Sequence, residues 1–178
     1  GPLTLAARHG GICYLDEVVE ARQDTTVVIH PLTDARRILP LDKKGEVVRA
    51  HPDFQLVVSY NPGYQSRTKD MKPSTRQRFA ALEFDYPDEA IEAEIVAHEA
   101  SVPMELARRL VSIALRSRKL KHHGLDEGIS TRMLIYAGVL IRSGVDARES
   151  CDMTMTRALT DDPDMSRALH GFVDACFA

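Results

Sequence analysis

Two adjacent acidic residues, Asp16 and Glu17, directly follow a short apolar run, ICYL at residues 12–15. Two like charges side by side at the end of a strand are unfavourable unless a metal ion or a reaction uses them. The alternative is a strand that simply leaves the core and enters a polar loop, because it would have the same sequence pattern. The chemical interpretation is a magnesium ligand followed by a base that activates water, as in nucleotide hydrolases.

A second polar residue, Asn61, stands at the end of the apolar run FQLVVSY at residues 54–60. In open α/β sheets, ligands bind beyond the carboxyl ends of the strands. An uncharged amide at that edge could orient a water or contact a terminal phosphate oxygen without titrating. Because Pro62 and Gly63 follow, Asn61 could equally be a turn residue.

A basic stretch at residues 67–78 holds five basic residues and one acid, and it includes Arg76 and Arg78. It can be read as a solvated loop, as a nucleic-acid patch, or as an arginine that reaches a phosphate across a subunit boundary. Only Tyr64 and Phe79 offer aromatic rings nearby, and the chain's net charge is −3. These observations argue against nucleic acid as a partner.

The block GISTRMLIY at residues 128–136 places Arg132 in the first turn of a predicted helix. The helix dipole disfavours a cation there, which hints at a role outside the helix. The seven histidines show no ligand spacing, because His122 and His123 are adjacent and no H-E-x-x-H occurs. We therefore do not expect a metal site built from protein side chains alone.

The composition is that of a soluble globular chain, with 178 residues, 44% hydrophobic and 28% charged. No apolar run approaches the roughly 20 residues that a membrane span needs. The three cysteines have no CxxC spacing, which favours a reduced, cytoplasmic setting. Since the chain begins with Gly1-Pro2 rather than Met, we expect a fragment or a processed chain.

Strand signals dominate the first half and helix signals the second. We expect strands at residues 12–15, 54–60 and 82–86 and a β-hairpin at 37–49 with Gly45 at its turn, whereas residues 20–37 are ambiguous between strand and helix. Helical periodicity marks residues 88–100, 103–120, 130–143, 148–159 and 163–177. The change near Tyr86-Pro87 predicts two domains, residues 1–86 and 87–178.

Four blocks in this order, GGICYLDEV, FQLVVSYNPGYQ, STRQRFAALEFDYP and GISTRMLIYAG, resemble the MoxR-type AAA+ ATPases of the CbbQ/NorQ group. The resemblance covers nearly the whole chain. It implies an α/β fold: the C-terminal part of an AAA+ P-loop NTPase core, with a parallel sheet and a β-hairpin insertion, followed by an α-helical lid. It also implies ATP and Mg²⁺ as cofactors.

The resemblance assigns a role to each acidic and amide candidate of the first half. It implies that Asp16 is the Walker B carboxylate that binds magnesium and that Glu17 is the catalytic glutamate. Asn61 matches the sensor 1 position, close to the terminal phosphate.

Two arginines complete the implied site. Arg78 matches the arginine finger, with Arg76 as the alternative, and Arg132 matches sensor 2 in the lid. No G-x-x-x-x-G-K-[ST] occurs in the 178 residues, so the phosphate cradle is absent. We therefore expect this chain alone to be inactive.

The implied function is an ATP-hydrolysing remodelling motor that works as a homo-oligomeric, typically hexameric, ring. Its family is associated with the activation of metalloenzymes such as rubisco or nitric oxide reductase, alongside a von Willebrand factor A-domain partner. Two alternatives stay open: a non-hydrolytic protein-interaction module, and a chelatase-type AAA+ subunit.

Overall fold

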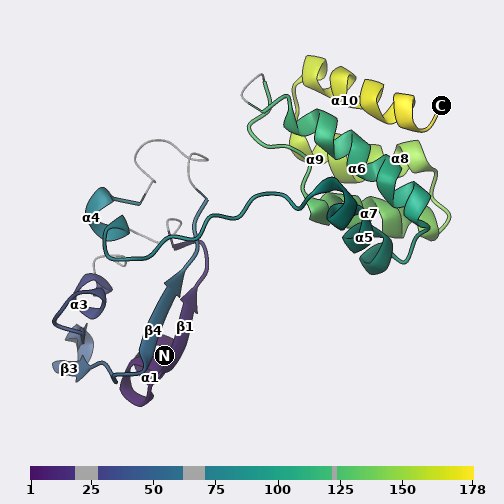
Figure 1. The fold of residues 1–178 in the computed structure, drawn as a ribbon. Helices are drawn as coiled ribbons and strands as arrows, with labels where there is room; N and C mark the ends of the chain where they lie inside the picture. Colours follow the sequence, from purple (N-terminus) through teal and green to yellow (C-terminus); the bar gives the residue numbers. More distant parts are fainter. Residues whose placement is uncertain (19–27, 62–70, 122–123) are drawn as a thin grey trace. The chain divides into compact units, whose positions relative to one another are not determined.

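The computed structural model describes residues 1–18, 28–61, 71–121 and 124–178. Several predictions fall on segments outside these ranges: residues 20–27 of the ambiguous stretch at 20–37, the Pro62-Gly63 turn, the first part of the basic stretch, and the adjacent histidines. The chain forms two compact units, Gly1–Leu82 and Glu83–Ala178 (Figure 1). Each unit is described by itself.

The first unit is built on a parallel pair of strands, β1 (Gly11–Leu15) and β4 (Phe54–Val58). Their register runs from Gly11 opposite Phe54 to Leu15 opposite Val58. Helix α1 (Pro2–His9), which the sequence reading did not predict, contacts both strands. The parallel pairing brings the carboxyl ends of β1 and β4 to the same edge of the sheet.

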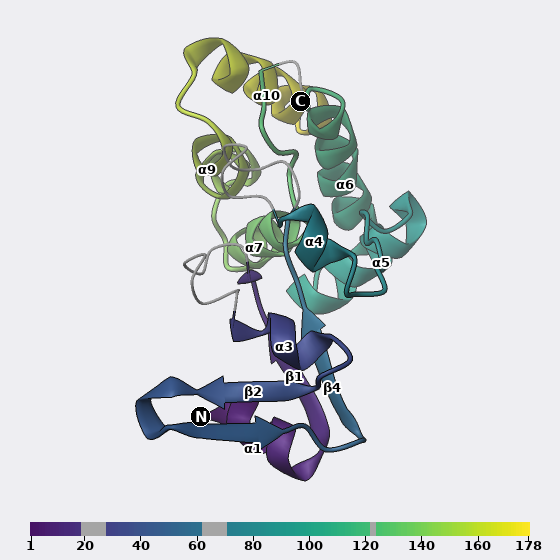
Figure 2. The ribbon, with the colours of Figure 1, turned by 90° about the vertical axis from the view of Figure 1, so that its left-hand side faces the viewer.

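The predicted hairpin is confirmed as the antiparallel pair β2 (Ile38–Leu41) and β3 (Glu46–Arg49), seen in Figure 2. The 3₁₀ turn η2 (Asp42–Lys44) joins the strands, followed by Gly45 at φ 59°. A left-handed backbone at this point suits glycine, which has no Cβ to clash. The Arg37 guanidinium donates to the backbone oxygens of His51 and Phe54, at 3.1 and 3.0 Å, and so ties the hairpin to β4.

The core of the first unit lies on one face of the β1–β4 pair. Its buried members come from α1, both sheets and the short helix α3 (His30–Thr33): Ala7, Cys13, Leu32, Leu39, Val48 and Phe54. On the strands' other face, Ile12, Tyr14 and Val57 are 69%, 58% and 43% exposed. The apolar run at 54–60 is therefore covered on one face only by the described residues, whereas a buried parallel strand is covered on both.

The strand predicted at residues 82–86 is wrong, because this segment forms no strand. Leu82 and Phe84 are 85% and 88% exposed. A strand exists only through the neighbour that pairs with its backbone, and no described residue of the chain provides one here. The compact units divide between Leu82 and Glu83, and Tyr86 packs with the helical unit.

The second unit is helical, as its periodicity predicts. Its helices are α5 (Glu89–Ala100), α6 (Met104–Arg118), α7 (Thr131–Arg142), α8 (Ala147–Cys151), α9 (Arg157–Leu159) and α10 (Pro163–Cys176). The single helix predicted at 148–159 is interrupted by a π-helical turn, Asp152–Thr156. Asp146 and Asp162 cap α8 and α10 through their side chains, whereas Ser130 precedes α7 without a side-chain cap bond.

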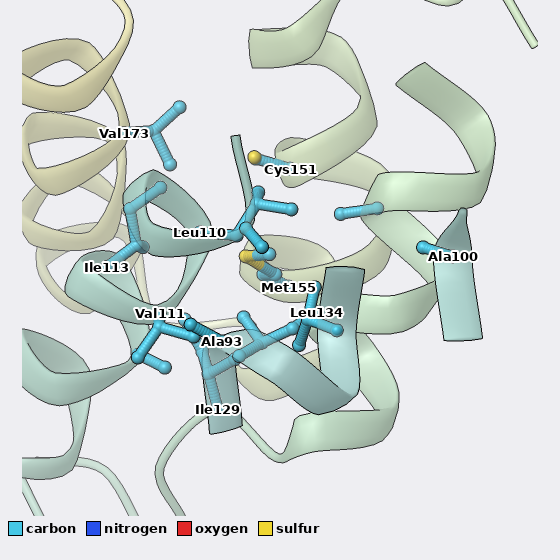
Figure 3. Packing of buried hydrophobic residues seen from close by; sticks show 14 of the residues in the cluster. Ala93, Ala100, Leu110, Val111, Ile113, Ile129, Leu134, Cys151, Met155 and Val173 are labelled. Atoms are coloured by element: carbon cyan, nitrogen blue, oxygen red, sulfur yellow. The ribbon is translucent and has the colours of Figure 1, made fainter. Parts of the chain in front are cut away.

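Buried side chains from α5, α6, α7 and α10 meet in the core of this unit, as Figure 3 shows. Leu110, Ile113 and Leu134 are fully buried within it. Helices α5 and α7 pack closely at Gly138, where a Cβ would lie 2.7 Å from the Cβ of Ala100. Among the described segments of the chain, no helix is long and apolar enough to cross a membrane.

Candidate functional site

The acidic pair stands at the carboxyl end of β1, opposite Ser59 on the chain that leaves β4. Ser59 donates its backbone N–H to the oxygen of Leu15 at 3.0 Å, and its own oxygen accepts from the N–H of Val18 at 3.0 Å. The parallel pairing therefore continues past the last strand residues, and its backbone hydrogen bonds lie on both sides of Asp16 and Glu17 along the chain. The two acidic residues lie in a backbone held at both ends.

Two hydroxyl groups donate to the Asp16 carboxylate. The Ser59 hydroxyl lies 2.6 Å and the Tyr14 hydroxyl 2.7 Å from Asp16 Oδ1. Tyr14 can reach it because residues two apart lie on the same face of a strand. These bonds lower the pKa of Asp16 from its usual value, and the bond from Ser59 has the larger effect. Asp16 is thus an anion at neutral pH.

Glu17 adopts a left-handed backbone, with φ 47°. A residue with a Cβ pays about 1–2 kcal/mol for this conformation. Its N–H donates to Ser59 Oγ at 3.0 Å, which supports the turn. Because the chain turns here instead of continuing as a strand, the carboxylates of Asp16 and Glu17 need not alternate between opposite faces. Both are exposed.

Asn61 lies on the same edge, two residues after Ser59, and is exposed. The parallel register places it beyond the carboxyl end of β4, as Asp16 and Glu17 lie beyond that of β1. These three residues are the part of the predicted site that the first unit brings to one edge.

Arg76 and Arg78 lie in and just after the short helix α4 (Pro73–Arg76). Arg76 is exposed, whereas Arg78 is half-buried and donates to the backbone oxygen of Ser74. Within the described residues, the Nε of Arg78 is buried without a hydrogen-bond partner. Neither side chain forms a hydrogen bond or ion pair with Asp16 or Glu17 within the described part of the chain.

His30 in α3 faces this arginine. Its Nε2 lies 2.8 Å from the hydroxyl of Thr75, so α3 and α4 are joined by a hydrogen bond. Burial, with the nearby charges of Arg78 and Lys72, lowers the pKa of His30. A neutral imidazole at this place limits the positive charge that accumulates around Arg78.

Arg132 belongs to the second unit, where it lies exposed in the first turn of α7. The described residues provide no hydrogen bond or ion pair for its side chain. Tyr14 and Ser59, by contrast, were missed by the sequence reading. Their signals were present, since Tyr14 precedes Asp16 by two residues and Ser59 precedes Asn61 by two.

The donor set at the sheet edge fits a hard cation, since it offers carboxylate, hydroxyl and amide oxygens. Magnesium is usually held by one or two carboxylates together with substrate phosphates and waters. Among the described residues, no group of three or more His, Cys, Asp or Glu could form a cage for a metal ion. The anionic Asp16 beside Glu17 therefore fits a magnesium ion held by one or two carboxylates together with phosphates and waters.

Comparisons with known proteins cover both units. Residues 1–79 match the family described as AAA domain (dynein-related subfamily), and residues 92–176 match CbbQ/NirQ/NorQ C-terminal. The chain is 66% identical over 178 residues to protein CbbQ of Hydrogenophilus thermoluteolus, covering 100% of this chain and 67% of that protein.

Two further relatives are a denitrification regulatory protein and a protein named NorQ. Identity is 56% over 174 residues to the denitrification regulatory protein NirQ of Pseudomonas aeruginosa, covering 98% of this chain and 67% of the relative. It is 53% over 177 residues to protein NorQ of Paracoccus denitrificans, covering 99% and 66%. The chain thus spans about two thirds of the length of these relatives. It belongs to the CbbQ/NirQ/NorQ group of MoxR-type AAA+ ATPases.

Proposed function

We propose that this chain is part of a magnesium-dependent AAA+ motor that hydrolyses ATP to remodel a partner protein. The observation that carries the proposal is the acidic pair Asp16–Glu17, held by Ser59 at the carboxyl end of β1 in a chain of this family. We infer that the phosphate-binding loop comes from outside these 178 residues, since the relatives are longer than the chain.

Each residue of the sheet edge receives one task. Asp16 would hold the magnesium ion, which would supply positive charge to offset that of the ATP phosphates. Glu17 accepts a proton from the attacking water, which typically contributes about 10²–10⁴-fold to the rate. Asn61 orients that water or the terminal phosphate without changing its own charge.

The arginines act on the γ-phosphate from other parts of the assembly. Arg78, or Arg76 in its place, serves as the finger that completes the neighbouring subunit's site, which contributes about 10³–10⁵-fold in such enzymes. Arg132 contacts the γ-phosphate from the lid. A finger that acts between subunits requires a ring of copies, and we propose a hexamer.

The partners follow from the family. We propose that the motor acts in the cytoplasm with a von Willebrand factor A-domain protein and activates a metalloenzyme of the rubisco or nitric oxide reductase type. No nucleic acid is expected as a substrate, because the chain carries a net charge of −3.

The acidic pair is tested in the protein that contains this chain together with its phosphate-binding loop. Glu17→Gln should lower turnover at least about 100-fold and leave ATP binding intact, because it removes only the base. Asp16→Asn should weaken magnesium-dependent ATP binding as well. Asp53→Asn is the matched control, because its carboxylate is 85% exposed at the opposite end of β4. A Glu17→Gln protein that keeps more than about a tenth of the rate would contradict the assignment.

The finger is tested by mixing inactive subunits. Arg78→Ala and Glu17→Gln proteins should each fail to turn over ATP, whereas mixed rings should recover activity where an intact Arg78 faces an intact Glu17. Absence of recovery at every mixing ratio, with mixed rings verified by mass, would leave Arg78 a structural role. Repeating the experiment with Arg76→Ala identifies which arginine acts.

A second candidate, a non-hydrolytic interaction module, is favoured by one observation: the 178 residues contain no G-x-x-x-x-G-K-[ST]. Under the motor proposal, the chain alone shows negligible turnover but the longer protein is active. If the longer protein also fails to bind ATP, the interaction module is the better description.

A further inference from the structure

The helical unit contains a carboxylate that is fully buried and fully hydrogen-bonded. Glu92 in α5 is 0% exposed. Arg118, at the end of α6, donates to it twice, from its two terminal nitrogens to the two carboxylate oxygens, each at 2.7 Å. The hydroxyl of Thr131, the first residue of α7, donates to Oε1 at 2.7 Å. One buried anion therefore joins three helices.

The same arginine also holds the segment that leads into α7. Its Nε and one terminal nitrogen donate to the backbone oxygen of Ile129, at 3.1 and 2.9 Å. The Tyr86 ring covers the guanidinium, with its centroid 3.6 Å from Cζ. Gly128 lies against Arg118 so closely that a Cβ there would come within 2.5 Å of Arg118 Cγ and 2.9 Å of its Cα.

Each residue from 128 to 131 is thereby fixed. Gly128 can carry no side chain beside Arg118, and its oxygen lies 3.5 Å from the Tyr86 hydroxyl. Ile129 is 1% exposed and donates its N–H to Ser117 Oγ at 3.0 Å. The oxygen of Ser130 accepts from the N–H groups of residues 133 and 134. Thr131 is held by Glu92.

The residue that follows this anchored segment is different. Arg132 is exposed, and within the described residues its side chain makes no hydrogen bond or ion pair. Arg118 makes four hydrogen bonds inside the unit, whereas Arg132 makes none with the described residues. The buried contacts of Glu92, Arg118 and Thr131 thus hold the backbone directly before Arg132, whose guanidinium no described residue binds.

We propose that Arg118, Glu92 and Thr131 form a positioning network, which fixes the start of α7 so that Arg132 meets the γ-phosphate of ATP in one orientation. This inference rests on the sensor role proposed above for Arg132. Anion recognition by a long side chain is tight only when its backbone is already in place, because otherwise binding must also order the segment. A buried ion pair is a poor device for stability alone, since well-packed apolar residues of similar volume often serve as well.

The test uses Thr131, because its variants disturb the network least. In the protein that contains this chain with its phosphate-binding loop, Thr131→Val keeps the shape and removes the hydroxyl that donates to Glu92. Thr131→Ser keeps the hydroxyl and is the matched control. Affinities for ADP and for a slowly hydrolysed ATP analogue are measured for both, with the melting temperature as a check of folding.

Thr131→Val should weaken the ATP analogue by about 2- to 150-fold, the range of coupling between neighbouring residues, and leave ADP unchanged. Thr131→Ser should bind both nucleotides like the parent. In an Arg132→Ala background, Thr131→Val should have no further effect, because its action passes through Arg132. Arg118→Lys, which keeps the charge but not the fork of donors, should behave like Thr131→Val.

The outcomes separate the positioning network from the function it serves. If Arg132→Ala weakens the ATP analogue but Thr131→Val and Arg118→Lys do not, the positioning network is wrong and the sensor stands. If Thr131→Val weakens binding equally with and without Arg132, the network acts on the fold and not through Arg132, which also overturns it. If Arg132→Ala changes neither nucleotide, the sensor assignment fails and the positioning role with it, whereas Asp16 and Glu17 remain tested by their own variants.

Discussion

The buried pair of Glu92 and Arg118 predicts a large and specific loss of stability when only one partner is removed. Arg118→Met keeps an unbranched side chain of similar length but removes the charge. The Glu92 carboxylate, 0% exposed, then keeps only the hydroxyl of Thr131 as a donor. Breaking a buried ion pair in this way costs about 3–5 kcal/mol. We expect the upper part of that range, because the oxygen of Ile129 loses its two donors as well.

Removing both charges should cost less than removing one. In Glu92→Leu/Arg118→Met no uncompensated charge is left in the core, and such replacements are often neutral or stabilising. Two polar atoms, the oxygen of Ile129 and the hydroxyl of Thr131, still lose partners, and each unpaired buried group costs about 1–3 kcal/mol. The double variant should therefore be more stable than Arg118→Met, though less stable than the parent.

Urea unfolding of the chain, followed by its helical circular dichroism, measures these differences, since the chain has no tryptophan to report them by fluorescence. A loss of 3 kcal/mol or more should lower the melting temperature of the helical unit by about 12 °C or more. Arg109→Met is the control, because Arg109 pairs with Glu105 at 2.6 Å while the two side chains are 49% and 79% exposed. Such a surface pair contributes about 0.3–0.5 kcal/mol. If Arg118→Met lost no more than Arg109→Met, or the double variant lost more than Arg118→Met, the reasoning from buried charge would be refuted.

Three further predictions concern groups whose surroundings are equally specific. Ser59→Ala should raise the pKa of Asp16 toward its ordinary value, because it removes the closer of two hydroxyl donors, and carboxyl NMR titration of the chain measures this. Asp34 has a pKa of about 2, chiefly because the Arg36 side chain donates to it. A depressed pKa gives stability that is present above the unfolded pKa of about 3.9 and is lost as pH falls through the folded pKa. In Asp34→Asn, the free energy of unfolding should therefore fall less steeply between about pH 4 and pH 2, which urea unfolding at a series of pH values measures. Gly138→Val should destabilise the helical unit by about 1–3 kcal/mol in urea unfolding, since its Cβ would lie 2.7 Å from that of Ala100.

The elements that sequence reasoning found are those whose signals are local. The helices of the second unit follow from periodicity within a few turns, and the hairpin follows from Gly45 between two short apolar segments. The strand expected at residues 82–86 failed because a strand depends on a partner elsewhere in the chain, and propensity contains no information about that partner. The π-helical turn at Asp152–Thr156 interrupts a helix whose periodic pattern gave no sign of it.

The candidate site likewise contains residues that local sequence signals indicate and contacts that depend on distant parts of the chain. The place of Asp16, Glu17 and Asn61 at one edge of the sheet could be predicted, because each follows an apolar run and parallel strands bring their carboxyl ends together. Their roles stay predictions. The hydrogen bond from Ser59 to Asp16 could not be predicted, although Ser59 stands near Asn61, because it joins residues 43 positions apart.

The buried anchor of the helical unit was hidden for the same reason. Its contacts join Glu92 to residues 26 and 39 positions away in the chain. A charged residue within a helical pattern is normally read as part of a solvated face, and only the fold shows that Glu92 is enclosed.

The arginines of this chain show what a structure adds to a motif. In sequence each is a cation beside an apolar segment, and nothing local separates a structural arginine from one that binds a phosphate. In the folded units, the arginines differ in how many of their N–H groups are already bound by described residues. Arg118 directs all three of its nitrogens to Glu92 and Ile129, so it holds a segment of the fold and does not also bind a phosphate. Arg78 donates to Ser74 and keeps a buried Nε that no described residue satisfies, which suits a side chain that must rearrange before it acts. Arg132 makes no hydrogen bond or ion pair with any residue that the structure describes, and it follows a backbone segment held in place, which is the combination expected of an arginine that recognises a phosphate.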